Sequence, residues 1–205
     1  KNEFINNISL NDEQTLFLNT YGSLYAIDNE NMRINWFINL NQSIDLNLGN
    51  LFESNPVINN GKIIVISSNQ FTYILDNKSG SIIHKKNFSA LIKPIIIEDY
   101  LFLITKNNLL ISMNLESGKI IYSFNIDKKI ADFLNTKKKK AEYKKVILAN
   151  DKILIFLKNS YVLTFNIYGE LEKINKLPSK MKTSPIIVDR SILYLNKNNK
   201  LTVIN

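Results

Sequence analysis

The chain has 205 residues, of which 45% are hydrophobic and 21% charged, values that are ordinary for a protein with a sizeable core. It contains no Cys, which excludes disulfides, thiolate zinc sites and cysteine nucleophiles. Its 26 basic and 18 acidic side chains give a net charge of +8, which favours acidic partners, and its apolar runs are far shorter than the roughly 18 residues of a membrane-spanning helix.

One sequence unit recurs along the chain. Residues 56–88 and 94–126 align without a gap at an offset of 38, and the same template fits three more times. Spacings of 48, 38, 52 and 39 residues separate the equivalent positions Ile8, Pro56, Pro94, Val146 and Pro185. The repeat units span residues 8–40, 54–88, 92–126, 144–177 and 183–205. Five copies indicate a repeat protein.

Each unit has the pattern of four short strands. The second strand is almost continuously apolar, as in Ile63–Ile66, which is typical of burial on both faces. The fourth is more polar, as expected at an outer edge. The third strand ends at a polar residue that we expect to hydrogen-bond its own turn: Asp28, Asp76, Asn114, Asn166 and Asn205.

This pattern predicts the fold class. No stretch sustains a helical period over three turns, and each unit is close to the length of a propeller blade. We therefore predict an all-β propeller, or part of one, with about five four-stranded antiparallel blades in a single domain over residues 1–205.

The two long spacings locate insertions at residues 41–53 and 127–143. The second insertion holds the basic run Lys137, Lys138, Lys139 and Lys140, and Lys144 and Lys145 follow it. Because the compact units do not need this segment, we expect it to project from a rim, weakly ordered, with Phe133 and Leu134 as its apolar anchors. Its lysines form either a partner-binding loop, for an acidic partner or an anionic membrane, or a solvated loop without a ligand.

Several motifs resemble the PQQ-like (pyrroloquinoline-quinone-like) repeat propellers. The segment Tyr25-Ala26-Ile27-Asp28, followed eight positions on by Trp36, is similar to the blade motif of that family. The resemblance implies that a small residue of the third strand, here Ala26, receives the Trp of a neighbouring blade. The Trp position is filled by Trp36, His84, Tyr122 and, after a deletion, approximately Ile174. The glycine turn of the motif matches Ser79-Gly80-Ser81 and Ser117-Gly118-Lys119.

The end of the chain, residues 183–204, resembles within this family a propeller lipoprotein of the outer-membrane β-barrel assembly machinery. That resemblance implies a non-enzymatic scaffold of the bacterial envelope, periplasmic and anchored to the outer membrane through a preceding segment. Its partners would be proteins, including β-barrel assembly components, rather than nucleic acid or a small molecule. Two alternatives stay open for the ring. The chain is either the carboxyl-terminal portion of a longer propeller or a five-bladed ring in which Asn2–Asn7 supplies the missing strand.

The sequence offers little for catalysis or cofactor binding. His84 is the only histidine, and it falls on the packing position of Trp36 and Tyr122. There is no His/Cys cluster, no calcium loop and no glycine-rich phosphate loop. We therefore expect no catalytic residue, metal or cofactor. The competing hypotheses are a PQQ-dependent dehydrogenase-like domain and a ligand-sensing domain of a larger membrane protein.

Overall fold

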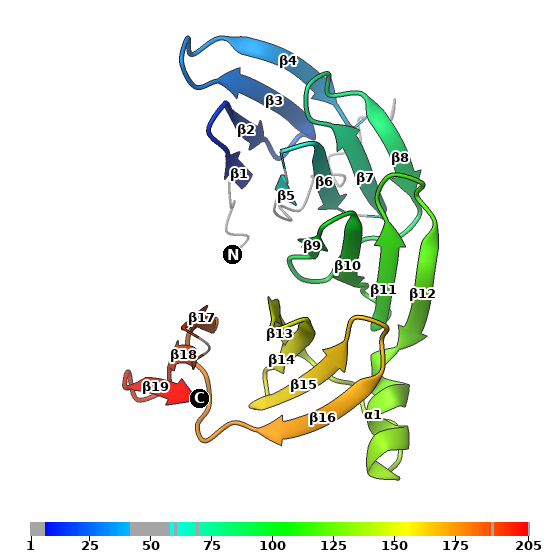
Figure 1. Cartoon of the computed structure of the whole chain (residues 1–205), viewed down its shortest axis with the longest axis vertical. Helices are drawn as coiled ribbons and strands as arrows, with labels where there is room; N and C mark the ends of the chain where they lie inside the picture. Colours follow the sequence, from blue (N-terminus) through cyan, green and yellow to red (C-terminus); the bar gives the residue numbers. More distant parts are fainter. Residues whose placement is uncertain (1–6, 42–57, 60, 69, 190, 205) are drawn as a thin grey trace. The chain divides into compact units, whose positions relative to one another are not determined.

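Five antiparallel sheets make up nearly all of the regular structure in a computed structural model, which describes residues 7–41, 58–59, 61–68, 70–189 and 191–204 (Figure 1). The predicted all-β fold class is confirmed, because each sheet has three or four strands in the order of the chain. The described part of the chain adds one helix, α1, to these sheets.

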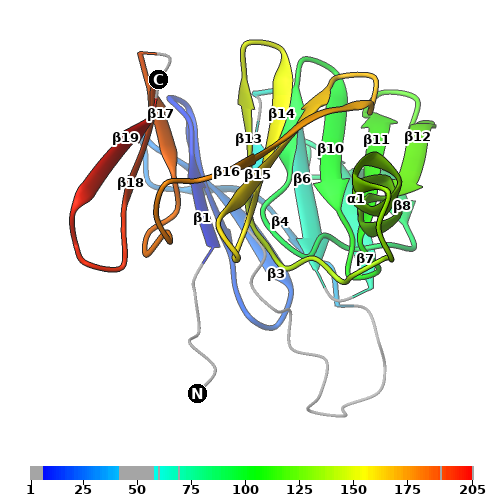
Figure 2. The same ribbon diagram turned by 90° about the horizontal axis from the view of Figure 1, so that it is seen from below.

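The strands follow the predicted units. The first sheet contains β1 (Asn7–Leu10), β2 (Gln14–Leu18), β3 (Ser23–Asp28) and β4 (Ile34–Asn39). The second contains β5 (Ile58–Asn59), β6 (Ile63–Ser68), β7 (Phe71–Asp76) and β8 (Ile82–Lys86). The third contains β9 (Ile95–Ile97), β10 (Tyr100–Ile104), β11 (Leu109–Asn114) and β12 (Ile120–Asn125). The fourth contains β13 (Tyr143–Ala149), β14 (Lys152–Leu157), β15 (Tyr161–Asn166) and β16 (Leu171–Lys176). The fifth contains β17 (Ile186–Val188), β18 (Ser191–Leu195) and β19 (Leu201–Ile204), and Figure 2 shows β18 and β19 as its hairpin.

Burial along the strands explains their order in each sheet. Four successive residues of β10, Leu101–Ile104, are buried, because this strand lies inside its sheet and is covered on both faces. The fourth strands β4, β8, β12 and β16 lie at sheet edges, and much of each is exposed. The exposed side chains of the first three of these strands are partly apolar, so the expected polar outer strand is not found there. They include Ile34, Phe37, Ile82, Ile83, Ile120 and Ile121.

The polar residues that end the third strands bind their own turns as predicted. The carboxylate of Asp28 accepts the backbone N–H groups of Glu30 and Asn31. The Asn114 amide oxygen likewise accepts from Ser117, and that of Asn166 from Glu170. Asp76 accepts the Ser79 hydroxyl and N–H, and these hydrogen bonds, the hydroxyl's first, lower the pKa of the Asp76 carboxyl. Asn205 lies outside the described residues.

The chain forms two compact units. The first comprises residues 1–91, 98–100 and 114–119, and its core lies between the first and second sheets, where Leu16, Leu24, Ile64 and Leu75 are fully buried. The second comprises residues 92–97, 101–113 and 120–205, and its core includes side chains of the third and fourth sheets together with Ile126 of the helix. The single domain expected over residues 1–205 stays a prediction.

The structure corrects the expectation for the second insertion. Residues 126–134 form the helix α1 (Ile126–Leu134), whereas the expectation was a projecting, weakly ordered segment. Its apolar residues Ile126, Ile130 and Leu134 recur every fourth position, as in a helix. This periodic stretch is shorter than the three turns that we required to predict a helix. The expected anchors are also wrong, because Phe133 and Leu134 are 47% and 49% exposed, whereas Ile126 and Asp127 are buried.

Lys144 and Lys145 belong to β13, as expected for the start of the repeat unit at residues 144–177. The Lys144 ammonium donates to the carbonyl oxygens of Met181 and Lys182, and that of Lys145 donates to the carbonyl oxygen of Pro185. Burial lowers the pKa of Lys144. These two lysines therefore tie the fourth sheet to the segment that precedes the fifth.

Two expectations fall on residues that are not described. Of the insertion at residues 41–53, only Asn41 is described. Of the segment Asn2–Asn7, only Asn7 is described, and it begins β1, which pairs with β2. In the described part of the chain no helix combines the length and the apolar character needed to cross a membrane.

Candidate functional site

Trp36 on β4 docks onto the turn that follows β7. Its indole Nε1 donates to the carbonyl oxygen of Asn77 at 3.1 Å, and its ring lies against Gly80. A Cβ atom at residue 80 would stand 2.7 Å from Cδ2 and 2.8 Å from Cζ3 of the ring. Gly80 also has φ of +69°, a conformation that favours glycine for a second reason. Both the contact and the backbone therefore require glycine here.

His84 on β8 repeats this arrangement one sheet along the chain. Its Nε2 lies 2.8 Å from the carbonyl oxygen of Glu116, and its ring lies against Gly118, where a Cβ atom would be 2.9 Å from the ring carbon Cγ. A carbonyl oxygen only accepts hydrogen bonds, so Nε2 carries a proton and donates. The side chain is thus used for packing and for one backbone hydrogen bond.

Tyr122 on β12 makes the third contact of this kind. Its hydroxyl donates to the carbonyl oxygen of Ile167 at 3.1 Å, and the ring lies against Gly169 together with that of Phe124. The Tyr122 and Phe124 rings are stacked at 5.5 Å, and Phe124 is stacked in turn on Phe165 at 5.7 Å. Burial raises the pKa of the Tyr122 hydroxyl to about 12.

These three contacts change the role expected for Ala26. Ala26 was expected to receive the Trp of a neighbouring blade, but it faces Trp36 across its own sheet, as a strand partner in the β3–β4 pair. The positions that receive rings are Gly80, Gly118 and Gly169. Ala26 is fully buried beside Trp36 in the core of the first unit, so a small side chain there leaves room for the indole ring on the same face.

A buried polar pair supports the Trp36 contact. Gln14 and Asn77 are 6% and 3% exposed, and the Gln14 amide donates to both the side-chain and the backbone oxygen of Asn77. The Asn77 amide in turn donates to the carbonyl oxygen of Gly61. The carbonyl that accepts from Trp36 is therefore fixed by contacts on both sides.

Helix α1 is fixed at its start by two polar residues. The side chain of Asn125 caps the helix by accepting the N–H of Lys128. Asp127, 3% exposed, accepts three hydrogen bonds, from the Asn108 amide, the Ala141 N–H and the Tyr143 hydroxyl. Burial, followed by the Asp127 charge, raises the pKa of Tyr143. Asp127 thus holds Ala141, at the far end of the lysine run, against the first turn of the helix.

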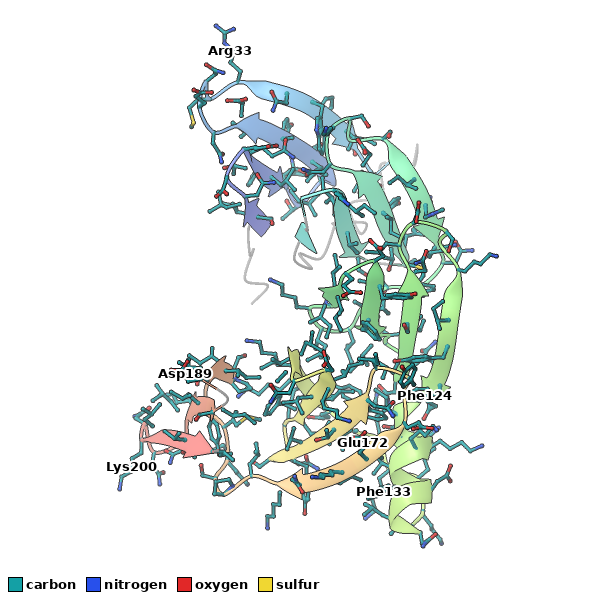
Figure 3. The ribbon with its side chains drawn as sticks, in the orientation of Figure 1. Arg33, Phe124, Phe133, Glu172, Asp189 and Lys200 are labelled. Atoms are coloured by element: carbon teal, nitrogen blue, oxygen red, sulfur yellow. The ribbon has the colours of Figure 1, made fainter. Side chains whose placement is uncertain are left out.

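A pocket of about 400 Å³ lies between α1, the lysine run and the fourth sheet. Its apolar lining comes from both sides: Ile130, Ala131, Leu134 and Ala141 on the helix and loop, and Leu157, Tyr161, Leu163 and Ile174 on the strands. Thr136 and Asn159 complete the lining together with three lysines, Lys137, Lys139 and Lys140. Figure 3 labels Phe133 on α1 and Glu172 on β16, the strand beside the helix.

The four lysines of the predicted loop differ in their relation to the pocket. All four are exposed, but Lys138 does not line the pocket. Ile174, the approximate fourth member of the Trp series, lines this pocket too. No acidic side chain is present among the described residues that form the lining, so the pocket is both apolar and positively charged.

The described residues do not fit a quinone–calcium site. Calcium takes oxygen ligands, mostly carboxylates, but no group of three His, Cys, Asp or Glu side chains gathers anywhere in the part of the chain that the structure describes. The pocket beside α1 offers cations instead.

The sequence analysis did not predict three features of the site: the glycines that pack against the rings, the buried hydrogen bonds of Asp127, and the apolar residues that line the pocket. The glycines had been identified only as turn residues, although the recurrence of Gly80 and Gly118 at the same place in two units could have marked them as contact positions. The segment Asn125-Ile126-Asp127 carries an amide and a carboxylate at a helix start, which is a recognised capping signal. No sequence signal indicates which strand residues face the helix.

Comparison with known proteins rests on structure alone. No protein-family model matches the sequence, and no curated protein sequence is similar to it. BamB from Moraxella catarrhalis is similar in structure, with a TM-score of 0.57 at 10% identity, over 96% of this chain and 70% of BamB. Quinohemoprotein alcohol dehydrogenase from Comamonas testosteroni gives a TM-score of 0.70 at 10% identity, over 97% of this chain and 41% of the enzyme.

This chain has a β-propeller fold. The computationally designed Ika8 protein is similar as well, with a TM-score of 0.71 at 10% identity, over 96% of this chain and 56% of the design. The propeller chain thus spans about half the length of the design and less than half of the dehydrogenase. At this identity the likeness shows the fold, and function has to be argued from the site.

Proposed function

We propose that this propeller chain is a non-enzymatic scaffold for protein–protein interaction in the bacterial envelope, comparable in role to the BamB subunit of the outer-membrane β-barrel assembly machinery. The observation that carries the proposal is the pocket beside α1. It joins an apolar lining to three exposed lysines on a segment that the repeating strands do not require. Such a surface suits binding rather than catalysis, because it offers apolar and charged contacts for a partner and no nucleophile paired with a general base.

The surrounding structure supports this role by keeping the segment in place. Asp127, in the first turn of α1, accepts hydrogen bonds from Ala141 and Tyr143 at the far end of the segment. The Tyr122, Phe124 and Phe165 rings are stacked between the third and fourth sheets. A binding surface on a rigid support loses less conformational entropy when a partner binds. The proposal places the protein in the periplasm, at the outer membrane, with β-barrel assembly components as its first candidate partners.

Complex formation tests the proposal. The purified chain would be mixed with purified β-barrel assembly components and followed by size-exclusion chromatography with light scattering. A co-eluting complex of defined mass is expected. In parallel, the chain would be incubated with pyrroloquinoline quinone, calcium and an electron-accepting dye. Dye reduction on adding an alcohol would contradict the scaffold role and favour the dehydrogenase-like alternative.

A further inference from the structure

We infer that the pocket beside α1 binds a short extended peptide segment in which acidic side chains alternate with large apolar ones. This inference rests on the proposed function and names the chemistry of the partner segment. Apolar side chains of the segment would enter the space between Leu134 and the strand residues Leu163 and Ile174. Its carboxylates would face Lys137, Lys139 and Lys140.

The charges of the lining determine the sign of the ligand. Three cationic side chains line the pocket and no acidic one does among the described residues that form it, so an anion is attracted and a cation repelled. All three lysines are exposed, so their amines stay hydrated and lose little solvation when they meet a carboxylate at the rim. The electrostatic part of binding should therefore be moderate and sensitive to salt.

The spacing of the lysines favours a peptide over a single head group. Lys137 and Lys139 are two residues apart, so their Cα atoms are separated by at most about 7 Å. In an extended peptide, side chains two residues apart lie on the same side at about the same spacing. Carboxylates at alternate peptide positions can therefore meet both lysines, whereas one lipid head group concentrates its charge at a single point.

The volume of the pocket and the exposed apolar surface at its edge suit the apolar side chains of such a peptide. A volume of about 400 Å³ accommodates a few large side chains and lies near the lower end for ligand pockets. Leu134 is half exposed at the edge of the pocket, so apolar surface is available there in the unbound protein. Covering this surface supplies the hydrophobic part of the affinity.

Binding of a defined peptide tests the inference. The probe is a fluorescein-labelled peptide containing Asp-Leu-Asp-Leu-Asp, followed by anisotropy with the complete chain at low salt. Two comparison peptides replace Asp by Asn or Leu by Ser. The acidic–apolar peptide should bind roughly tenfold more tightly than either, since each lacks one of the two contributions. Equal binding of the Leu-to-Ser peptide would mean general charge attraction and would overturn the inference.

Two pairs of variants locate the site. Lys139→Gln should weaken binding several-fold, whereas Lys138→Gln, in the same run but outside the lining, should leave it within about twofold. Leu134→Glu should abolish binding, whereas Phe133→Glu should not, although the two side chains are 49% and 47% exposed on the same helix. Equal effects within either pair would overturn the inference.

Two further outcomes separate this inference from the proposed function. Decanoate carries one carboxylate on an acyl chain; if it bound and the peptide did not, the pocket would be a lipid site and the inference would fail. If the chain formed its complex with assembly components, and Leu134→Glu and Lys139→Gln left that complex unchanged, the scaffold role would stand while the inference failed.

Discussion

Gly80 lies directly against the indole ring of Trp36, in a position that no other residue can take without displacing the ring. A Cβ atom would be under 3 Å from three ring carbons, and φ at Gly80 is +69°. The same relationship recurs between His84 and Gly118, and between Tyr122 with Phe124 and Gly169. In each of these contacts, one sheet supplies an aromatic ring, and the turn of the next sheet supplies a glycine backbone against which the ring packs.

Replacing Gly80 by Ala should destabilise the first unit strongly. The added methyl group displaces Trp36, and the loss of that packing adds to about 1–2 kcal/mol of left-handed backbone strain. Gly61→Ala is the matched control, since φ there is +88° but nothing lies within 4 Å of the added Cβ. Urea unfolding followed by the fluorescence of Trp36, the only tryptophan, measures both. Equal unfolding midpoints would show that the ring contact contributes nothing.

Exchanging the ring at residue 84 should be tolerated where removing it is not. His84→Tyr places at this position the residue found at the equivalent position 122, and its hydroxyl can reach the turn carbonyl as Tyr122 does. We expect it to unfold within about 1 kcal/mol of the parent, whereas His84→Ala should cost about 2–3 kcal/mol through lost packing and an unpaired carbonyl. Chemical unfolding followed by circular dichroism compares them. A tyrosine variant as unstable as the alanine variant would contradict this expectation.

The raised pKa of Tyr122 should make stability fall at high pH. The ordinary tyrosine pKa is about 10 and burial raises that of Tyr122 to about 12, so between these values the unfolded chain loses a proton that the folded chain keeps. The contribution is present below about pH 10 and is lost as the pH rises towards about 12. Tyr122→Phe, less stable at neutral pH because its hydrogen bond is lost, should therefore approach the parent as the pH rises.

Unfolding midpoints in urea at several pH values between about 8 and 11.5 would show this convergence. Tyr168→Phe serves as the control, because that side chain is 76% exposed. A gap between the parent and Tyr122→Phe that stays constant with pH would exclude the burial of this hydroxyl.

Asp127 should be the most sensitive residue of the α1 segment. Asp127→Ala leaves three donors without an acceptor in a buried place, and we expect a loss of about 3 kcal/mol. Asp132→Ala, on the exposed side of the same helix, should change stability by less than about 0.5 kcal/mol. Hydrogen exchange of residues 126–143 measures the local effect. Similar protection in the two variants would mean that Asp127 does not hold the segment.

The repeats predicted the strands well because a strand pattern is local. Alternation, apolar runs and turn residues such as Asp76 and Asn114 are all read within one unit, and their backbone hydrogen bonds form as expected. The residues that contact each other between neighbouring sheets were harder to predict from the sequence. The sequence places Trp36 and Ala26 in one unit, but only the structure shows that they share a face while the ring is received by Gly80.

The α1 segment shows a second limit of sequence-based prediction. Its helix is only nine residues long and depends on the cap of Asn125 and the buried bonds of Asp127 rather than on a long period. The four lysines look equivalent in the sequence, yet Lys138 is the one of the four that does not line the pocket. Such differences arise from the neighbouring strands, which are distant in sequence.

The receiving side of these three ring contacts is made of main-chain atoms, a carbonyl oxygen and a glycine Cα. An indole, an imidazole and a phenol each donate to such a carbonyl oxygen, at 3.1, 2.8 and 3.1 Å. Mutation can therefore replace one ring by another without shifting a strand register. Joints of this kind are compatible with a fold that is similar to that of BamB from Moraxella catarrhalis over 96% of this chain at 10% sequence identity.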